Sequence, residues 1–340
     1  MDSAFFVKIK RSRKINMIEV SGFFMYIYQN FAACSGRHAS GMGSRFYYPN
    51  NLVCYIQLPI SGFAMQHHSY GSTTHVGNVR SHNEDSYRAV PGLGLWIVAD
   101  GMGGHEGGEK ASALAADFIV EQVREGEILS RAISQSHHAI KQAVADEKGP
   151  AGMGTTVVAL RVVDTSCEIA WVGDCRAYLW NGETLRQLTK DHSYVQHLVD
   201  TGVIPAIESE KHPYQDILIQ ALGAADMDDV AVDEIREDLF EGEQILLCSD
   251  GLTKELDEGA ISGILRLDAN EQSKVEHLVN AALSNGGKDN ITTILVSAAN
   301  NAPPRLTEED TVPFITQKII PPGFMDKLRD WWQRITGKAG

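Results

Sequence analysis

The chain has 340 residues, 43% hydrophobic and 22% charged, which is enough for one large domain or two small ones with a substantial core. Its formal net charge is −14, and residues 1–64 hold seven Lys or Arg against two acidic residues, so the rest of the chain carries −19. Such an acidic body argues against nucleic acid as the main partner and is compatible with the binding of divalent cations.

The five cysteines are odd in number and show no Cys-x-x-Cys spacing. This usage predicts a reducing compartment, the cytoplasm, and argues against a disulfide framework or a zinc site. The cysteines are Cys34, Cys54, Cys167, Cys175 and Cys248.

Residues 1–64 differ in pattern from the rest of the chain. Basic residues between Lys8 and Lys14 precede the apolar stretch Ile18 to Ala33, an order similar to that of a secretory signal. Polar residues interrupt this stretch, and no run approaches the ~20 apolar residues that a membrane-spanning helix needs. Three interpretations stay open: a disordered extension, translated upstream sequence before a true start at Met42 or Met65, and a membrane anchor.

From about residue 65 the pattern becomes regular. The apolar run Leu93 to Ala99, bounded by Asp100 and glycines, predicts a buried strand that stops at Asp100. Apolar residues at helical spacing predict further elements along the chain. The expected helices cover Glu109 to about Val123, Ile128 to Ala145, Ser193 to Thr201 and Asn270 to Ser284.

Two hairpins are expected between these helices. The runs Val157 to Val163 and Cys167 to Val172 are separated by so few residues that they must pair antiparallel. Asn181-Gly182 is a strong hairpin-turn signal between Tyr178–Trp180 and Thr184–Leu188. Antiparallel hairpins with segregated helices predict an α+β fold of packed layers and not a doubly wound parallel sheet.

After Ala299 the composition changes to a Pro-rich linker, and Phe324 to Ile335 has the pattern of an amphipathic helix. This helix either packs back on the domain or docks a partner or a membrane. We therefore divide the chain into an N-terminal extension (1–64), a catalytic domain (65–299) and a linker with a C-terminal helix (300–340).

Carboxylates recur at the ends of apolar runs. Asp100, Asp174 and Asp250 each follow such a run, and Asp289 precedes one. Because an isolated buried carboxylate is expensive to desolvate, a cation is expected beside them. Four such positions predict one assembled site, and hard oxygen donors suit magnesium or manganese.

Two such ions can generate a nucleophile from water and polarise a phosphoryl oxygen. A guanidinium is well suited to grip a phosphate, and Arg80 lies just before the acidic pair Glu84-Asp85. These residues predict metal-assisted phosphoester hydrolysis, with a calcium-stabilised structural domain as the alternative.

Six segments, in order, resemble the motifs of bacterial metal-dependent serine/threonine protein phosphatases of the 2C (PPM) type. The resemblance covers about residues 70–298. The segments are Gly77-Asn78-Val79-Arg80-Ser81-His82-Asn83-Glu84-Asp85-Ser86, Asp100-Gly101-Met102-Gly103-Gly104-His105, Gly152-Met153-Gly154-Thr155-Thr156, Gly173-Asp174-Cys175-Arg176, Ser249-Asp250-Gly251-Leu252 and Asp289-Asn290-Ile291-Thr292.

The resemblance implies an αββα sandwich of two antiparallel sheets flanked by helices, with metals in a cleft at one end. It also implies direct attack of metal-bound hydroxide on phosphoserine or phosphothreonine, without a phosphoenzyme. By the same resemblance, Asp100 bridges two manganese or magnesium ions, the Gly101 carbonyl binds one of them, and Asp250 and Asp289 complete the other. Glu84 and Asp85 hold metal-bound waters, and Arg80 binds the phosphate. Asp174 with Asp250 matches a third metal position of bacterial members.

Two positions depart from the family pattern. Met102 stands where many eukaryotic members have a general-acid His, so His105 becomes the candidate acid, or else a loop His without a catalytic role. Cys175 replaces the usual Ser and is either a small buried residue or an oxidation-sensitive thiol beside Asp174.

The implied partners are a phosphorylated protein substrate and an opposing bacterial serine/threonine kinase in signalling, and we expect a monomer. The segment Asp191 to Leu222 resembles the mobile flap of the family and should carry substrate preference. A binding-only pseudophosphatase and a phosphatase of small metabolites stay open as alternatives.

Overall fold

The computed structural model describes residues 68–104, 106–206, 208, 212–299, 302 and 305, and the backbone of five short strands nearer the N-terminus. The chain forms two compact units, Met1–Met65 and Gln66–Gly340. In the first unit the strands pair antiparallel in the order β1-β2-β3-β5-β4. They are β1 (Val7–Arg11), β2 (Ile15–Val20), β3 (Phe23–Tyr28), β4 (Arg45–Tyr47) and β5 (Val53–Tyr55).

The three interpretations of residues 1–64 are not tested, because the side chains of this segment lie outside the described residues. The Pro-rich linker and the helix expected over Phe324 to Ile335 lie outside the described residues as well. Among the described helices, none is long and apolar enough to cross a membrane. The division of the chain at 64 and 299 stays a prediction.

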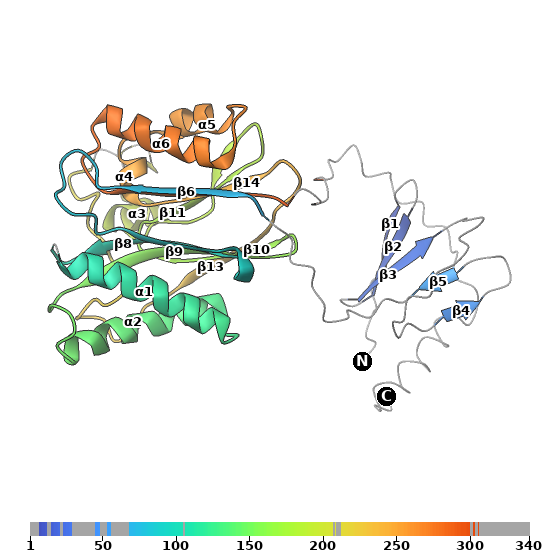
Figure 1. Ribbon diagram of the computed structural model, residues 1–340, viewed down its shortest axis with the longest axis horizontal. Coiled ribbons are helices and arrows are strands. Elements are labelled where there is room, and N and C mark those ends of the chain that lie inside the picture. The colour runs from blue at the N-terminus through green and yellow to red at the C-terminus, as the bar shows by residue number, and fades with distance from the viewer. Residues whose placement is uncertain are drawn as a thin grey trace. The chain divides into compact units, whose positions relative to one another are not determined.

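The second unit is a sandwich of two five-stranded antiparallel sheets with helices on both outer faces (Figure 1). This arrangement confirms the predicted αββα architecture of the α+β class. One sheet has the order β13-β10-β9-β8-β7 and consists of β7 (Ser86–Val90), β8 (Leu95–Met102), β9 (Gly154–Val163), β10 (Ser166–Val172) and β13 (Asp233–Asp238). The other has the order β12-β11-β14-β15-β6 and consists of β6 (Tyr70–His75), β11 (Arg176–Trp180), β12 (Leu185–Gln187), β14 (Gln244–Cys248) and β15 (Ile291–Ser297).

The central strands are continuous apolar runs because both of their faces are buried. Alternate residues of β8 point to opposite sides: Ile97 packs toward the helices, whereas Trp96 and Val98 pack between the sheets. In β14, Leu247 packs between the sheets and Leu246 packs toward the other helical layer. The period of two therefore builds three apolar layers in one unit.

Helices α1 and α2 cover the first sheet, and α4, α5 and α6 cover the second (Figure 1). Asp257 and Asn270 cap α5 and α6, because each side chain accepts a hydrogen bond from a backbone N–H in the first turn. The helices are α1 (Glu106–Arg124), α2 (Leu129–Ala145), α3 (Tyr194–Asp200), α4 (Asp250–Thr253), α5 (Glu258–Leu265) and α6 (Glu271–Asn285), with the 3-10 turn η1 (Pro91–Leu93).

The four expected helices and both expected hairpins are present, with small shifts at their ends. The strand expected to stop at Asp100 continues to Met102, because Asp100, Gly101 and Met102 pair with the first residues of β9. The loop at Asn181-Gly182 is one residue longer than expected, because β12 begins at Leu185 and not at Thr184, and the Asn181 side chain accepts hydrogen bonds from the backbone of Glu183 and Thr184.

Candidate active site

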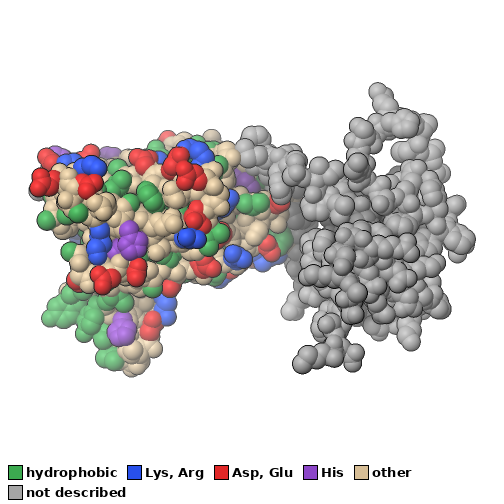
Figure 2. Space-filling view, turned by 90° about the horizontal axis from the view of Figure 1, so that it is seen from below, with side chains coloured by type: hydrophobic (Ala, Val, Ile, Leu, Met, Phe, Trp, Pro, Cys, Tyr) green, Lys and Arg blue, Asp and Glu red, His purple; other side chains and the backbone are tan. Residues whose placement is uncertain are grey.

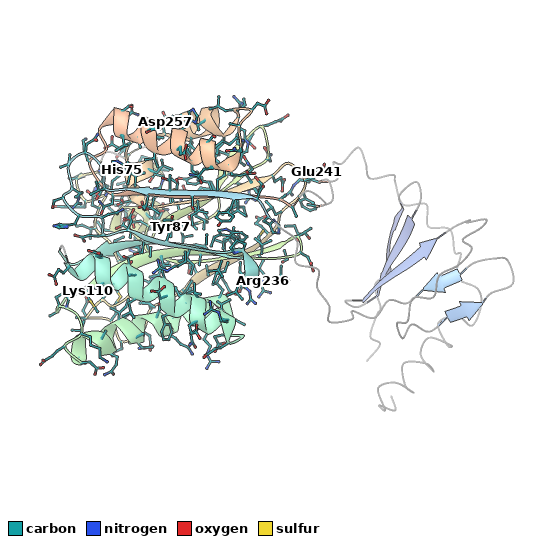
Figure 3. All side chains as sticks on the ribbon, viewed as in Figure 1. His75, Tyr87, Lys110, Arg236, Glu241 and Asp257 are labelled. Carbon is teal, nitrogen blue, oxygen red and sulfur yellow. The ribbon has the colours of Figure 1, made fainter. Side chains whose placement is uncertain are left out.

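The predicted carboxylates lie at one end of the sandwich. Asp100 lies on β8, Asp250 comes two residues after β14, and Asp289 lies two residues before β15. Because β14 and β15 are antiparallel neighbours, the end of β14 lies beside the start of β15. Figure 3 labels His75 at this end, where β6 finishes opposite the start of β15, and Glu241 at the far end.

The pKa of Asp100 indicates that other acidic groups lie around it. Burial raises the pKa of Asp100 well above its ordinary value, and neighbouring aspartates raise it further. Burial, followed by the charges of Asp250 and Asp191, raises the pKa of Asp174 to about 8. Such a cluster of buried acids is stable as anions only beside positive charge. The neighbours acting on Asp100 are Asp85, Asp250, Asp174 and Asp289.

Asp85 is buried and held by two hydroxyls. Ser249 Oγ and Thr292 Oγ1 donate to Asp85 Oδ2 at 2.8 and 2.7 Å. Burial raises the pKa of Asp85 to about 7, although both hydrogen bonds lower it. The second oxygen, Oδ1, is buried without a hydrogen-bond partner among the described residues, as is Asp250 Oδ1. Two orphaned carboxylate oxygens therefore face the interior of the site.

The loop that carries Glu84 is fixed to the site by Asn290. Asn290 Nδ2 donates to the carbonyls of Val76 and His82, both at 2.9 Å, and its Oδ1 accepts the backbone N–H of Glu84 at 2.8 Å. The Glu84 carboxylate lies over the first turn of α1, because a Cβ on Gly108 would lie 2.1 Å from Glu84 Oε2. Glycine is required where the backbone and this carboxylate approach so closely.

Gly251 allows a second close approach, beside Asp250. A Cβ at this position would lie 2.0 Å from the backbone oxygen of Asn290. We expect Gly251→Ala to destabilise the protein by about 1–3 kcal/mol, as overpacking does, and to lower the melting temperature by roughly 2–10 °C. Thermal melting of the metal-free protein measures this effect.

Gly263→Ala is the matched control, because Gly263 is exposed on α5 and a Cβ there meets nothing within 4 Å. Alanine in an exposed helix is favoured by up to ~1 kcal/mol over glycine, so this variant should melt at the same temperature or slightly higher. If both variants melt at the same temperature, the backbone around Asp289 and Asn290 accommodates the added Cβ without loss of stability.

Two basic side chains neutralise part of the acidic cluster. Arg80 Nε and Nη2 donate to Asp289 Oδ1 and Oδ2 at 2.9 and 3.0 Å, a bidentate pair, and 55% of the Arg80 side chain is exposed. Lys254 Nζ lies 2.6 Å from Asp250 Oδ2, 3.1 Å from Asp216 Oδ1 and 3.7 Å from Asp289 Oδ2. Burial opposes the charge of Lys254, but the carboxylates outweigh it and raise the pKa of this ammonium.

The third predicted metal position and the flap meet at Asp174. Cys175 beside it is buried, and its Sγ lies 3.1 Å from Thr156 Oγ1. Arg176 Nε and Nη2 donate to Asp191 Oδ1 and Oδ2 at 2.9 and 2.6 Å, at the start of the flap. Burial raises the pKa of the Cys175 thiol, so it is an inert small residue and not a reactive thiolate.

Most of the predicted site residues thus come together in the structure. The predicted acid, His105, lies outside the described residues, and the role of the Gly101 carbonyl stays a prediction. Sequence analysis missed Lys254, although a lysine four residues after Asp250 is a recognisable i,i+4 pair. It also missed the positioning roles of Ser249, Thr292 and Asn290, which are parts of the same motifs.

The donor set fits divalent cations. In the part of the chain that the structure describes, no three Asp, Glu, His or Cys side chains converge as ligands of one metal ion. Arg80 and Lys254 instead hold Asp289 and Asp250, while Asp85 and Asp250 each keep one buried oxygen without a hydrogen-bond partner. Oxygen-only ligands with surplus negative charge suit magnesium or manganese.

The raised pKa values predict how pH changes the stability of the metal-free protein. Asp85 and Asp174 have folded pKa values of about 7 and 8, above the ordinary 3.8 expected in the unfolded chain. Between about pH 4 and pH 8 the folded state therefore binds more protons, and stability falls as pH rises. With a chelator present, we expect the melting temperature to drop by at least ~4 °C across this window.

The matched variant for this titration is Asp85→Asn, which removes one of the responsible groups. Its melting temperature should depend less steeply on pH than that of the unmodified protein. A flat or rising profile in the unmodified chain would contradict the buried acidic cluster.

Comparison with known proteins identifies the family. The family model for protein phosphatase 2C matches residues 74–295, most of the second unit. The chain belongs to the protein phosphatase 2C family. The matched range contains every residue of the acidic cluster and both of its basic partners.

Proteins similar to this chain include bacterial serine/threonine phosphatases. The serine/threonine phosphatase stp of Listeria welshimeri is 37% identical over 233 residues, 65% of this chain and 92% of the relative. The crystal structure of the Mycobacterium tuberculosis phosphatase PstP/Ppp is 32% identical, covers 68% of this chain and 99% of its own, and has a TM-score of 0.62. The chain is therefore a bacterial protein serine/threonine phosphatase.

A further solved structure bears on the metal. The catalytic domain of the phosphatase PstP in complex with two manganese ions is 31% identical and has a TM-score of 0.59. It covers 68% of this chain and 97% of its own. Divalent-metal dependence is consequently expected for this phosphatase, as its oxygen-rich donor set already indicates.

Proposed function

We propose that this phosphatase hydrolyses phosphoserine and phosphothreonine in proteins with two manganese or magnesium ions, and that it opposes a serine/threonine kinase in bacterial signalling. The observation that supports the proposal is the cluster of buried aspartates around Asp100, two of its members with an orphaned oxygen, beside an exposed bidentate guanidinium. The free, buried thiols of Cys167, Cys175 and Cys248 agree with a reducing cytoplasm.

Each residue then has a distinct task. Asp100, Asp250, Asp289 and the Gly101 carbonyl would hold the two ions, with Asp100 as a ligand of both, while Glu84 and Asp85 would orient water. Bound ions would supply a nucleophile from water at neutral pH and polarise the phosphoryl oxygens, which would allow direct attack on phosphorus without a phosphoenzyme.

The other residues position these groups and the substrate. Ser249 and Thr292 hold Asp85 in one orientation through its Oδ2. Arg80 lies at the rim with more than half of its side chain exposed, so it can exchange Asp289 for the phosphate oxygens of an incoming residue.

The test is hydrolysis of a phosphothreonine peptide by the full chain, stripped of metal with a chelator and then titrated with manganese. We expect phosphate release that appears only with manganese and that does not occur with the matching phosphotyrosine peptide. A folded protein that stays inactive at every manganese concentration would overturn the proposal and favour a binding-only role.

A further inference from the structure

Lys254 is a half-buried cation at the acidic end of the described domain, and no proposed catalytic task uses it. Its side chain is 36% exposed, and its ammonium lies among carboxylates from three segments that are far apart in sequence. Asp250 begins α4 just after β14, Asp289 comes from the loop before β15, and Asp216 comes from the flap.

We propose that the Lys254 ammonium is a resident cation that keeps a third divalent ion from binding between Asp174 and Asp250. This inference rests on the proposed function, because it concerns the metal stoichiometry of the same site. The phosphatase then works with two ions, and a side chain supplies the third positive charge.

The two oxygens of Asp250 have different surroundings. Oδ1 is buried and has no hydrogen-bond partner among the described residues, so it is free to bind an ion beside Asp100. Oδ2 is held by Lys254 at 2.6 Å. A third ion would need an Asp250 oxygen beyond the one given to the pair of ions, and that oxygen already has a cation.

The other carboxylates near this position are also paired. Burial and the charges of Asp250 and Asp191 raise the pKa of Asp174, and the charge of Lys254 opposes that rise. Arg176 holds Asp191 in a bidentate pair, and Lys254 holds Asp216 at 3.1 Å. Both flap carboxylates that could complete a third site are therefore occupied by basic side chains.

The same ammonium connects the flap to the site. Asp216 is 62% exposed, and a surface ion pair alone contributes little, typically below 1 kcal/mol. Its partner Lys254 is however already held by Asp250, four residues away along the chain. The contact with Asp216 therefore does not cost the side-chain entropy of ordering Lys254.

The experiment counts manganese ions per chain by equilibrium dialysis and by calorimetric titration. The variants are Lys254→Met, which removes the charge at similar length, Lys254→Arg, which keeps it, and Asp174→Asn, which removes the remaining ligand of a third site. Phosphothreonine-peptide hydrolysis and circular dichroism are recorded for each protein.

We expect two ions in the unmodified chain, in Lys254→Arg and in Asp174→Asn, and three ions in Lys254→Met. Combining Lys254→Met with Asp174→Asn should return the count to two. Three ions in the unmodified chain, or two in a folded Lys254→Met variant, would overturn the inference while leaving the proposed function intact.

If Lys254→Met does not fold, the manganese count of Asp174→Asn is compared with that of the unmodified chain. The loss of one ion in Asp174→Asn would show that a third ion binds despite Lys254 and would overturn the inference. Failure of the proposed function gives a different result: no manganese bound to the unmodified chain and no hydrolysis at any metal concentration.

Discussion

Asp100→Asn is expected to lower kcat by at least ~10³-fold while the protein stays folded. The substitution keeps the volume of the side chain but removes the central charge of the acidic cluster, which four other aspartates surround. Loss of shared metal coordination forfeits several kcal/mol of transition-state stabilisation, and each 1.36 kcal/mol is about tenfold in rate. Steady-state hydrolysis of a phosphothreonine peptide under saturating manganese measures the effect.

The stability of this variant should change in the opposite direction when metal is absent. Burial and then repulsion by its neighbours raise the pKa of Asp100. An uncharged side chain avoids both costs, so the metal-free variant should melt at the same or a higher temperature. Asp117→Asn is the matched control: Asp117 lies on α1, is 67% exposed and pairs only with Arg88 among the described contacts. Near-normal activity of Asp100→Asn would rule out its bridging role.

The residues at the strand ends were predictable because their motifs are local. Asp100, Asp250 and Asp289 stand beside apolar runs, and a carboxylate in that position is unusual enough to indicate a cation. Their assembly at one end follows from antiparallel pairing of β14 with β15, two strands that are separated by three helices and that no hairpin signal joins.

Two edge strands were not predicted from the sequence. β13 reads Asp-Glu-Ile-Arg-Glu-Asp and is largely exposed, and it becomes a strand only by pairing with β10. β6 is polar and only partly buried, and it pairs with β15 more than 200 residues later in the chain. Neither has an apolar period of its own, because an edge strand packs little of its surface.

One cation partner, Arg80, was predicted from its place before Glu84-Asp85, whereas Lys254 was not. Lys254 contacts Asp216, but this pairing depends on where the flap folds back, which no local spacing specifies. The face seen in Figure 2 carries acidic and basic side chains interspersed, so a lysine or arginine of this chain has no special meaning until its neighbours are known. A long-range contact, and not its residue type, distinguishes Lys254 from the other basic residues.

Arg80→Ala is expected to raise KM by about 10- to 100-fold and to change kcat little. The guanidinium is bidentate toward Asp289 and largely exposed, so it can bind the phosphate before the reaction begins. A hydrogen bond to a charged group contributes about 1.5–3 kcal/mol, and binding that is equal in the ground state and the transition state appears in KM. Initial rates over a range of phosphopeptide concentrations separate the two parameters.

Arg80→Lys is the informative companion, because lysine keeps the charge and loses the fork geometry that binds two oxygens at once. Its KM should lie between those of the unmodified chain and Arg80→Ala. If Arg80→Ala instead lowers kcat with KM unchanged, then Arg80 acts only in the transition state, and its exposed position beside Asp289 is a resting position that it leaves during the reaction.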